Sequence, residues 1–366
     1  MNEYFARRRD KLKRIIRKHK LPALLITNVK NVTYLTGFTG DDSYLLVTPD
    51  RDLILSDPRY EIQITEECPG IDAHIRKPSE QLLQVTCGVL NSLEVTGIGI
   101  ESQTMTVAMY EALKADTTAS LLPHAGLVEQ LREIKDAKEI ATLQRAIEIA
   151  QRVFQSIRVQ LRGAQTELEI AHEIEREIRL LGGSGCSFKP IVAVGARAAL
   201  PHASPALSQV AQDSLLLIDW GATVDGYRSD LTRVLIQGRP NARVSKVYET
   251  VLAAQTAAIE CMRPGVLVSE VDQAARAVID RAGMGKHFNH GLGHGIGLDI
   301  HETPRLGKNQ DRELEPGMVV TVEPGIYYAG WGGVRIEDDV LITRDGCEVL
   351  SDLPKQLEES CVSLLN

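Results

Sequence analysis

The chain has 366 residues, which is more than a single hydrophobic core usually organises, so its length predicts two domains. Hydrophobic residues make up 43% and charged residues 25% of the sequence, as in ordinary globular proteins, and the net charge of −8 argues against nucleic acid as a partner. No apolar run approaches the roughly 18 residues that a membrane span needs, and the N-terminus lacks the apolar region of a signal peptide, so no membrane partner is expected.

Six cysteines are scattered along the chain without the C-x-x-C spacing of a cysteine metal site. Free thiols of this kind are typical of a reducing compartment, so we expect a cytoplasmic protein without disulfides. The six are Cys68, Cys87, Cys186, Cys261, Cys347 and Cys361.

The N-terminal segment is strongly basic between Arg7 and Lys20, with apolar Leu12, Ile15 and Ile16 interleaved. This pattern predicts an amphipathic helix whose basic face meets solvent, with a partner or membrane contact as the alternative. Apolar runs of strand length follow, separated by turn-forming segments rich in Gly, Asp and Pro. These runs are Ala23–Ile26, Tyr44–Val47 and Leu53–Leu55.

From Glu129 to Arg162 apolar residues recur every three or four positions, which predicts a long charged helix. A helix that leads into a new region predicts a domain junction at its start, so we expect one domain over residues 1–132 and another over 133–366. The second domain contains every candidate ligand. Further helices are predicted at Glu167–Leu181, Ser245–Met262 and Val268–Ala282.

The first predicted hairpin turns at Asp225–Gly226, a strong two-residue turn signal that follows an apolar strand. Counting back from this turn places Gly221 opposite Asp230, with Asp219 as a diagonal neighbour of Asp230 on the same face. Diagonal neighbours lie roughly 7–8 Å apart, so the two carboxylates can converge on one pair of metal ions. The same register places Thr232 opposite Asp219.

A second segment repeats this plan. An apolar strand ends in Glu323–Pro324–Gly325, Trp331–Gly332–Gly333 is expected to turn the chain, and Glu337 lies on the returning strand. Two hairpins that each present one carboxylate per strand suggest an internally duplicated α/β core with pseudo-twofold symmetry. Clustered like charges are costly without a cation, so acids that merely decorate ordinary strands are the less favoured interpretation.

His290 and His294 lie in a segment in which glycine occupies every second position from Gly291 to Gly297, and His301 follows it. The alternating glycines argue against a helix and favour a closely packed strand or loop. No H-E-x-x-H sequence is present, which excludes a zinc helix of the thermolysin type.

One imidazole and four carboxylates from these segments suit a pair of divalent ions. An oxygen-rich set favours Mn²⁺, with Co²⁺ or Zn²⁺ as alternatives. Two such ions ~3.5–4 Å apart can activate a water and hold a tetrahedral intermediate, so the chain is interpreted as a dinuclear metallohydrolase. The five predicted ligands are Asp219, Asp230, His294, Glu323 and Glu337.

These motifs resemble those of the pita-bread metallopeptidases, most closely the proline-specific branch of Xaa-Pro dipeptidases (prolidases) and Xaa-Pro aminopeptidases. The resemblance spans roughly residues 134–350, and Asn31–Gly40 is similar to the creatinase-type N-terminal domain. It implies an α/β (α+β) fold, with a creatinase-type N-terminal α/β domain before a pita-bread catalytic domain, and it implies a homodimer. The motifs are Ile218–Gly221, Ser229–Arg233, His290–Gly297, Glu323–Gly325 and Arg335–Asp338.

The resemblance implies a division of labour among the ligands. Asp219 would bind one metal ion, and Asp230 and Glu337 would bridge both. His294 and Glu323 would complete the second ion, and Glu323 would also shuttle a proton.

The resemblance assigns other polar residues to the substrate pocket. His202, His290 and His301 would line it and stabilise the intermediate or the leaving proline, which makes His202 and His301 catalytic candidates beside Glu323. Arg335 would contact the substrate or orient the loop that carries the last ligand.

The expected function is hydrolysis of the peptide bond before proline, in dipeptides or at the N-terminus of longer peptides. Thr232 and Thr321 are candidate residues whose hydroxyl groups would orient the ligands.

A methionine aminopeptidase shares the metal set but commonly lacks so large an N-terminal domain, and a creatinase-like amidinohydrolase does not use these five ligands. A hydrolase of another small amide or modified amino acid, or a metal-stabilised binding module, are further alternatives.

Overall fold

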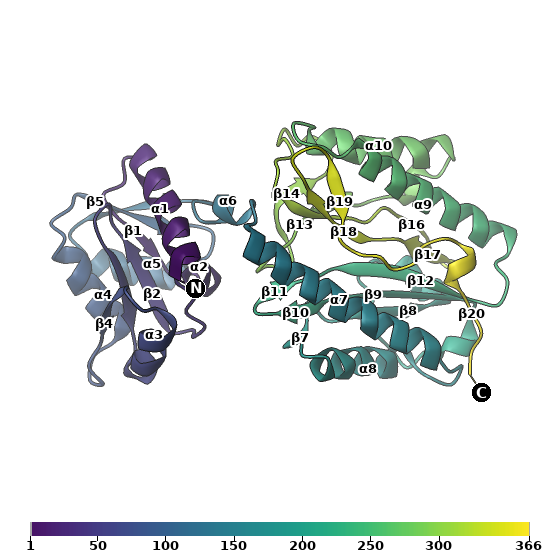
Figure 1. Ribbon diagram of the computed structural model, residues 1–366, viewed down its shortest axis with the longest axis horizontal. Helices are drawn as coiled ribbons and strands as arrows, with labels where there is room; N and C mark the ends of the chain where they lie inside the picture. Colours follow the sequence, from purple (N-terminus) through teal and green to yellow (C-terminus); the bar gives the residue numbers. More distant parts are fainter. Residues whose placement is uncertain (1, 366) are drawn as a thin grey trace. The chain divides into compact units, whose positions relative to one another are not determined.

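The computed structural model describes residues 2–365, which fall into two compact units, one that ends at Arg132 and one that begins at Glu133 (Figure 1). Each unit combines β-sheet with helices. Within residues 2–365, no helix combines the length and the apolar character that crossing a membrane requires.

The first unit is built on one six-stranded mixed sheet, and the three strands predicted from apolar runs are confirmed as its β1, β2 and β3. The sheet order is β4-β3-β2-β1-β5-β6, with β1 antiparallel to β2 and parallel to β5. The strands are β1 (Leu24–Ile26), β2 (Ser43–Val47), β3 (Asp52–Ser56), β4 (Asp72–Ile75), β5 (Gly97–Glu101) and β6 (Ser120–His124), and the helices are α1 (Asn2–Lys18), α2 (Val29–Thr36), α3 (Glu61–Glu67), α4 (Leu82–Asn91), α5 (Val107–Asp116) and α6 (Glu129–Arg132).

The basic helix α1 is not simply a solvated face, because two of its arginines are buried. Arg8 donates a hydrogen bond to the carbonyl oxygen of Tyr34 at 3.0 Å, and Arg9 donates to that of Leu35 at 2.7 Å. Both carbonyls belong to the last turn of α2, where a helix leaves carbonyl groups without partners. The prediction of a wholly solvated basic face is therefore wrong for these two side chains.

The second unit holds the segments that carry all five predicted ligands. Its helices are α7 (Ala137–Gln160), α8 (Glu167–Leu180), α9 (Ala242–Cys261) and α10 (Val268–Arg281). Its strands are β7 (Gly185–Cys186), β8 (Ile191–Val194), β9 (Leu215–Trp220), β10 (Ala222–Val224), β11 (Tyr227–Arg228), β12 (Leu231–Gln237), β13 (Gly293–Gly295), β14 (Glu302–Leu306), β15 (Val319–Val322), β16 (Gly325–Tyr328), β17 (Gly332–Arg335), β18 (Asp338–Ile342), β19 (Cys347–Val349) and β20 (Cys361–Val362).

One order of elements occurs twice in this unit, as the duplicated α/β core predicts. Two helices, α7 and α8, precede strands β8, β9 and β12 of one sheet, which the C-terminal β20 completes, and two more, α9 and α10, precede the sheet β14-β13-β15-β18-β19. Each sheet contains an antiparallel pair, β9 with β12 and β15 with β18. We call these two antiparallel pairs, β9–β12 and β15–β18, the first and the second ribbon. A single bridge between Thr232 and Glu337 joins the two sheets, so the two ribbons meet at the ends that carry the predicted ligands.

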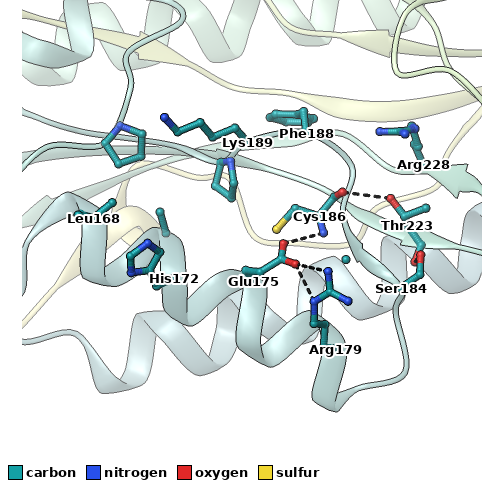
Figure 2. Close-up of a pocket in the computed structure, with 14 residues that line it drawn as sticks. Leu168, His172, Glu175, Arg179, Ser184, Cys186, Phe188, Lys189, Thr223 and Arg228 are labelled. Carbon is teal, nitrogen blue, oxygen red and sulfur yellow. Dashed lines mark hydrogen bonds and ion pairs between the residues drawn. The ribbon is translucent and has the colours of Figure 1, made fainter.

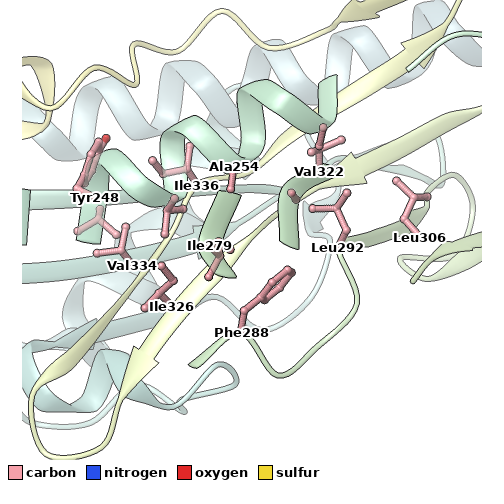
Figure 3. Close-up of a cluster of buried hydrophobic side chains, with 14 of the residues drawn as sticks. Tyr248, Ala254, Ile279, Phe288, Leu292, Leu306, Val322, Ile326, Val334 and Ile336 are labelled. Atoms are coloured by element: carbon pink, nitrogen blue, oxygen red, sulfur yellow. The ribbon is translucent and has the colours of Figure 1, made fainter. Parts of the chain in front are cut away.

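Helices α7 and α8 cover one face of the β9 strand, and helices α9 and α10 cover the other (Figure 1). Successive residues of β9 point to opposite faces, so Leu217 joins the hydrophobic cluster that α9 and α10 complete, whereas Ile218 joins the cluster under α7 and α8. Figure 3 shows the first cluster, with Ile279 of α10 among its members. Because of this alternation, Asp219 shares a face with Leu217.

Two predicted boundaries are wrong. The predicted helix from Glu129 breaks after α6, and α7 begins anew at Ala137. Asp136 and Glu139 form a reciprocal capping box, in which each side chain accepts a hydrogen bond at 3.0 Å from the backbone N–H of the other. Just before it, the N–H of Lys135 donates to the carbonyl of Gly317 at 2.8 Å, which ties the segment between the two helices to a distant part of the same unit.

The second hairpin turns earlier than predicted. Tyr328 pairs with Gly332, so Ala329–Trp331 make the turn, and the two glycines after Trp331 lie in β17. A Cβ atom on Gly333 would lie 2.2 Å from the carbonyl oxygen of Ala198. Glycine is needed there for close packing of β17 against the neighbouring backbone rather than for the turn.

Candidate metal centre and substrate pocket

The register counted from the first turn is confirmed, since Thr232 pairs with Asp219. A Cβ atom on Gly221 would lie 1.8 Å from the carbonyl oxygen of Ser229, so only glycine lets the two strands of this hairpin meet. Asp219 is therefore held in β9, while Asp230 lies at the break between β11 and β12. Both carboxylates are buried.

The second hairpin presents its acids at a break in both strands. Glu323 follows β15 directly, and Glu337 precedes β18 directly, where Val322 pairs with Asp338. Continuing this register by one residue places Glu323 opposite Glu337. The interruption frees both residues from regular pairing on their own ribbon, and Glu337 instead bridges to the first ribbon.

The structure brings all five predicted ligands together. Asp219, Asp230 and Glu337 each offer a carboxylate oxygen, and these oxygens lie within 4.8 Å of one another. The Nε2 atom of His294 lies 3.3 Å from Oε1 of Glu323 and 3.7 Å from Oδ2 of Asp230. Side chains from two ribbons and from β13 thus enclose one small volume.

The glycine-rich segment forms a closely packed strand, β13, which is one of the two predicted alternatives. A Cβ atom on Gly293 would lie 2.1 Å from the carbonyl oxygen of Thr321, and one on Gly295 would meet a backbone oxygen of the next strand at 2.2 Å. This contact lets the N–H of His294 donate to Oγ1 of Thr321 at 3.1 Å. The same hydroxyl donates to Oε1 of Glu323 at 3.1 Å, so Thr321 holds two of the predicted ligands.

Arg335 connects the two ribbons from within the site and is only 3% exposed. It forms an ion pair with Asp219, and its Nε atom donates to Oγ1 of Thr232 at 3.0 Å. Thr232 in turn donates to Glu337 at 2.6 Å. Although Thr232 pairs with Asp219 in the sheet, its hydroxyl therefore orients Glu337, a predicted ligand on the other ribbon.

Tyr327 is a site residue that sequence reasoning missed. Its hydroxyl lies 2.9 Å from a guanidinium nitrogen of Arg335 and 3.0 Å from Nε2 of His290, and burial raises its pKa to about 12. It thereby joins a predicted pocket histidine to the arginine that holds a predicted ligand. Its place four residues after Glu323 was a signal that could have been read, but the adjacent Tyr328 offered the same residue type.

The electrostatics of the cluster favour a bound cation. Burial, together with the charge of Glu337, raises the pKa of Asp230 well above its ordinary value, and burial and the charge of Glu323 do the same for Glu337. Burial would also raise the pKa of Glu323, but the hydrogen bond and charge of His294 outweigh it and lower that pKa to about 2. Negative charge on Asp230 and Glu337 is therefore costly without a cation, and a bound metal ion would lower both pKa values.

An unpartnered oxygen marks the same place. Oδ1 of Asp219 is buried and accepts no hydrogen bond from any residue in the described range 2–365. A buried carboxylate oxygen without a partner carries a large desolvation cost, which coordination of a cation would offset. The oxygen-rich donor set and this orphaned oxygen together fit divalent metal ions.

A pocket of about 1030 Å³ opens beside the five predicted ligands. Burial lowers the pKa of His290, and burial and the nearby His294 lower that of His301 to about 4, so both rings are neutral near pH 7. Lys189 and Arg305 also line this pocket and were not singled out from the sequence. The four predicted pocket residues that line it are His202, His290, His301 and Arg335.

The chain is similar to known proteins over nearly its whole length. Residues 8–134 match the Creatinase/Prolidase N-terminal domain. A solved Xaa-Pro dipeptidase from Bacillus anthracis has 34% sequence identity and a TM-score of 0.93, with 99% of this chain and 100% of that chain covered. An X-Pro aminopeptidase from Thermotoga maritima has 34% identity and a TM-score of 0.88, with 96% and 100% covered.

A third relative is an Xaa-Pro dipeptidase of Pyrococcus horikoshii, 34% identical over 352 residues that cover 95% of this chain and 98% of the relative. The catalytic unit matches metallopeptidase family M24 over residues 141–344, which is more than half of the chain. The chain therefore belongs to metallopeptidase family M24, with the pita-bread catalytic fold behind a creatinase-type N-terminal domain that its motifs predicted.

Proposed function

We propose that this metallopeptidase uses two divalent metal ions to hydrolyse the bond before proline, in Xaa-Pro dipeptides and at the N-terminus of longer peptides. The observation that carries the proposal is the convergence of four carboxylates and one imidazole at a pocket with three further histidines. The similar Xaa-Pro dipeptidases and X-Pro aminopeptidase support the substrate class.

The five converging side chains would hold the two ions. Asp219 would bind one ion, Asp230 and Glu337 would bridge both, and His294 and Glu323 would bind the other. Bound ions of this kind polarise the scissile carbonyl and make water a stronger nucleophile near neutral pH. The oxygen-rich set supports Mn²⁺, with Co²⁺ and Zn²⁺ as alternatives.

The chain's own side chains would move the proton that cleavage requires. The departing proline nitrogen carries no hydrogen in the peptide and must gain one before it leaves. Glu323 would take a proton from the attacking water and return it to that nitrogen, and the hydrogen bond that Thr321 donates to it at 3.1 Å supports this role by fixing the orientation of the carboxylate. His202 and His301 line the same pocket and would hydrogen-bond the reacting groups.

Arg335 would act mainly by positioning. Its guanidinium is engaged by Asp219, Thr232 and Tyr327, which supports a role in holding the ligands rather than a primary role in substrate binding. His290, which hydrogen-bonds the same tyrosine, would contact the substrate.

We also propose that the enzyme works in the cytoplasm as a homodimer. All six cysteines are unpaired, which supports a reducing compartment. The dimer rests on the family resemblance.

The test is hydrolysis of Gly-Pro, Gly-Pro-Pro and Met-Ala by protein that has been chelated and then supplied with Mn²⁺. Gly-Pro hydrolysis is expected only after the metal is restored, because the metal ions supply the activated water. Cleavage of Met-Ala in preference to Gly-Pro would point to a methionine aminopeptidase and contradict the proposal.

A further inference from the structure

A second cavity, of about 560 Å³, lies between α8 and the chain that runs from β7 to Pro190 (Figure 2). Its volume is in the range of sites that bind small ligands, roughly 300–1,000 Å³. Figure 2 shows His172 and Glu175 of α8 on one side of it, with Phe188 and Lys189 on the other.

The second cavity adjoins the catalytic pocket. Three successive residues, Phe188, Lys189 and Pro190, line both. The next residue, Ile191, pairs with Asp219 of the metal centre, while at the other end of this segment Cys186 pairs across to β10. A bound peptide that extends from the metal centre along residues 188–190 would therefore reach the second cavity.

The second cavity carries an excess of positive charge. Lys189 is exposed, and Arg228 donates to backbone carbonyl oxygens, those of Leu298 at 3.3 Å and of Ser187. Neither cation forms an ion pair with a carboxylate anywhere in residues 2–365. The one acid that lines the cavity, Glu175, is already neutralised, because it pairs with Arg179 at 2.7 Å.

We propose that this second cavity binds the C-terminal carboxylate of peptides whose N-terminal Xaa-Pro bond lies at the metal centre. The proposal rests on the proposed function and extends it to longer peptides. Cleavage before proline leaves the rest of the substrate on the C-terminal side, and that side ends in a carboxylate. A cavity with unpaired cations favours this carboxylate over a terminal ammonium group.

The test measures the binding of product-like peptides by calorimetry, so that it does not depend on turnover. Pro-Ala, Pro-Ala-Ala and Pro-Ala-Ala-Ala contain no bond before proline, and each is compared with its C-terminal amide on the Mn²⁺-loaded and the chelated protein. At the length that reaches the second cavity, the free acid is expected to bind roughly five- to tenfold more tightly than the amide, as a charge-assisted hydrogen bond provides.

Variants at an exposed residue test the location. Ser184 lines only the second cavity, so Ser184→Glu adds a negative charge there, and Ser184→Gln is a neutral control of nearly the same size. Ser184→Glu is expected to abolish the preference for the acid, whereas Ser184→Gln keeps it. Lys189→Gln is expected to weaken the preference and Lys189→Arg to retain it.

Equal affinities for acid and amide at every length would overturn the inference, as would identical behaviour of the two Ser184 variants. Hydrolysis of Gly-Pro without any acid preference would leave the proposed function standing and remove this site alone. An acid preference that Ser184→Glu abolishes, found without Gly-Pro hydrolysis, would support the carboxylate site and contradict the proposed function.

Discussion

Glu323→Gln is expected to lower kcat/KM for Gly-Pro by about a thousandfold, within the range of general acid–base catalysis. Glutamine keeps the shape of the side chain and can accept the hydrogen bond that Thr321 donates at 3.1 Å, but it cannot take up and return a proton. Steady-state kinetics in excess Mn²⁺, with the metal content of each preparation measured, separate this loss from a loss of metal.

The matched control for this experiment is Glu348→Gln, which makes the same chemical change at the exposed position of β19 and should leave the rate unchanged. If Glu323→Gln retains near-full activity while carrying the same amount of metal as the unaltered protein, Glu323 does not move the proton. The activity would then have to be assigned to another group in the pocket.

Glu337→Gln is expected to change stability in opposite directions with and without metal. In chelated protein it removes a negative charge from beside Asp219 and Asp230, so the thermal midpoint should rise, by roughly 2–4 °C for each kcal/mol of relief in a unit of this size. In protein saturated with Mn²⁺ it removes a bridging ligand, so much of the stabilisation from binding, about 4 kcal/mol at a thousandfold excess over Kd, should disappear.

Thermal unfolding of the same preparations in EDTA and in Mn²⁺ measures both expected shifts of the thermal midpoint. Glutamine can still accept the hydrogen bond from Thr232, so the comparison isolates the charge. Destabilisation of equal size in both conditions would mean that Glu337 has a structural role and does not hold a metal ion. Glu348→Gln should shift neither midpoint.

Local sequence signals were sufficient to place each pair of acids within its own ribbon. The Asp225–Gly226 turn fixed the register that puts Thr232 opposite Asp219, because the side-chain period of a strand is two. The alternating glycines before His301 indicated close strand packing for a similar local reason, the space that a neighbouring backbone occupies.

The contact between the two ribbons could not be predicted by counting residues from a turn. The bridge between Thr232 and Glu337 joins residues that are far apart in the chain, and the two ribbons were assigned to one centre from the chemistry of their acids and from the family resemblance, not from a strand register. Tyr327 was missed because its spacing from Glu323 does not distinguish it from the adjacent Tyr328, and only its contacts with His290 and Arg335 show its importance.

Some errors were avoidable and others were not. The capping box of Asp136 and Glu139 is written in the sequence, and it should have ended the predicted helix before Ala137. The burial of Arg8 and Arg9 could not be read from helical periodicity, because it depends on the end of α2 lying beside α1. Positive charge alone does not distinguish a solvated arginine from one that caps another helix.

The most direct test of the metal centre is a crystal of the protein grown with Mn²⁺ and measured for anomalous scattering. Two peaks are expected, with the bridging carboxylates of Asp230 and Glu337 between them. No peak in this volume, or these side chains directed to separate places, would contradict the two-metal centre on which the proposed chemistry depends.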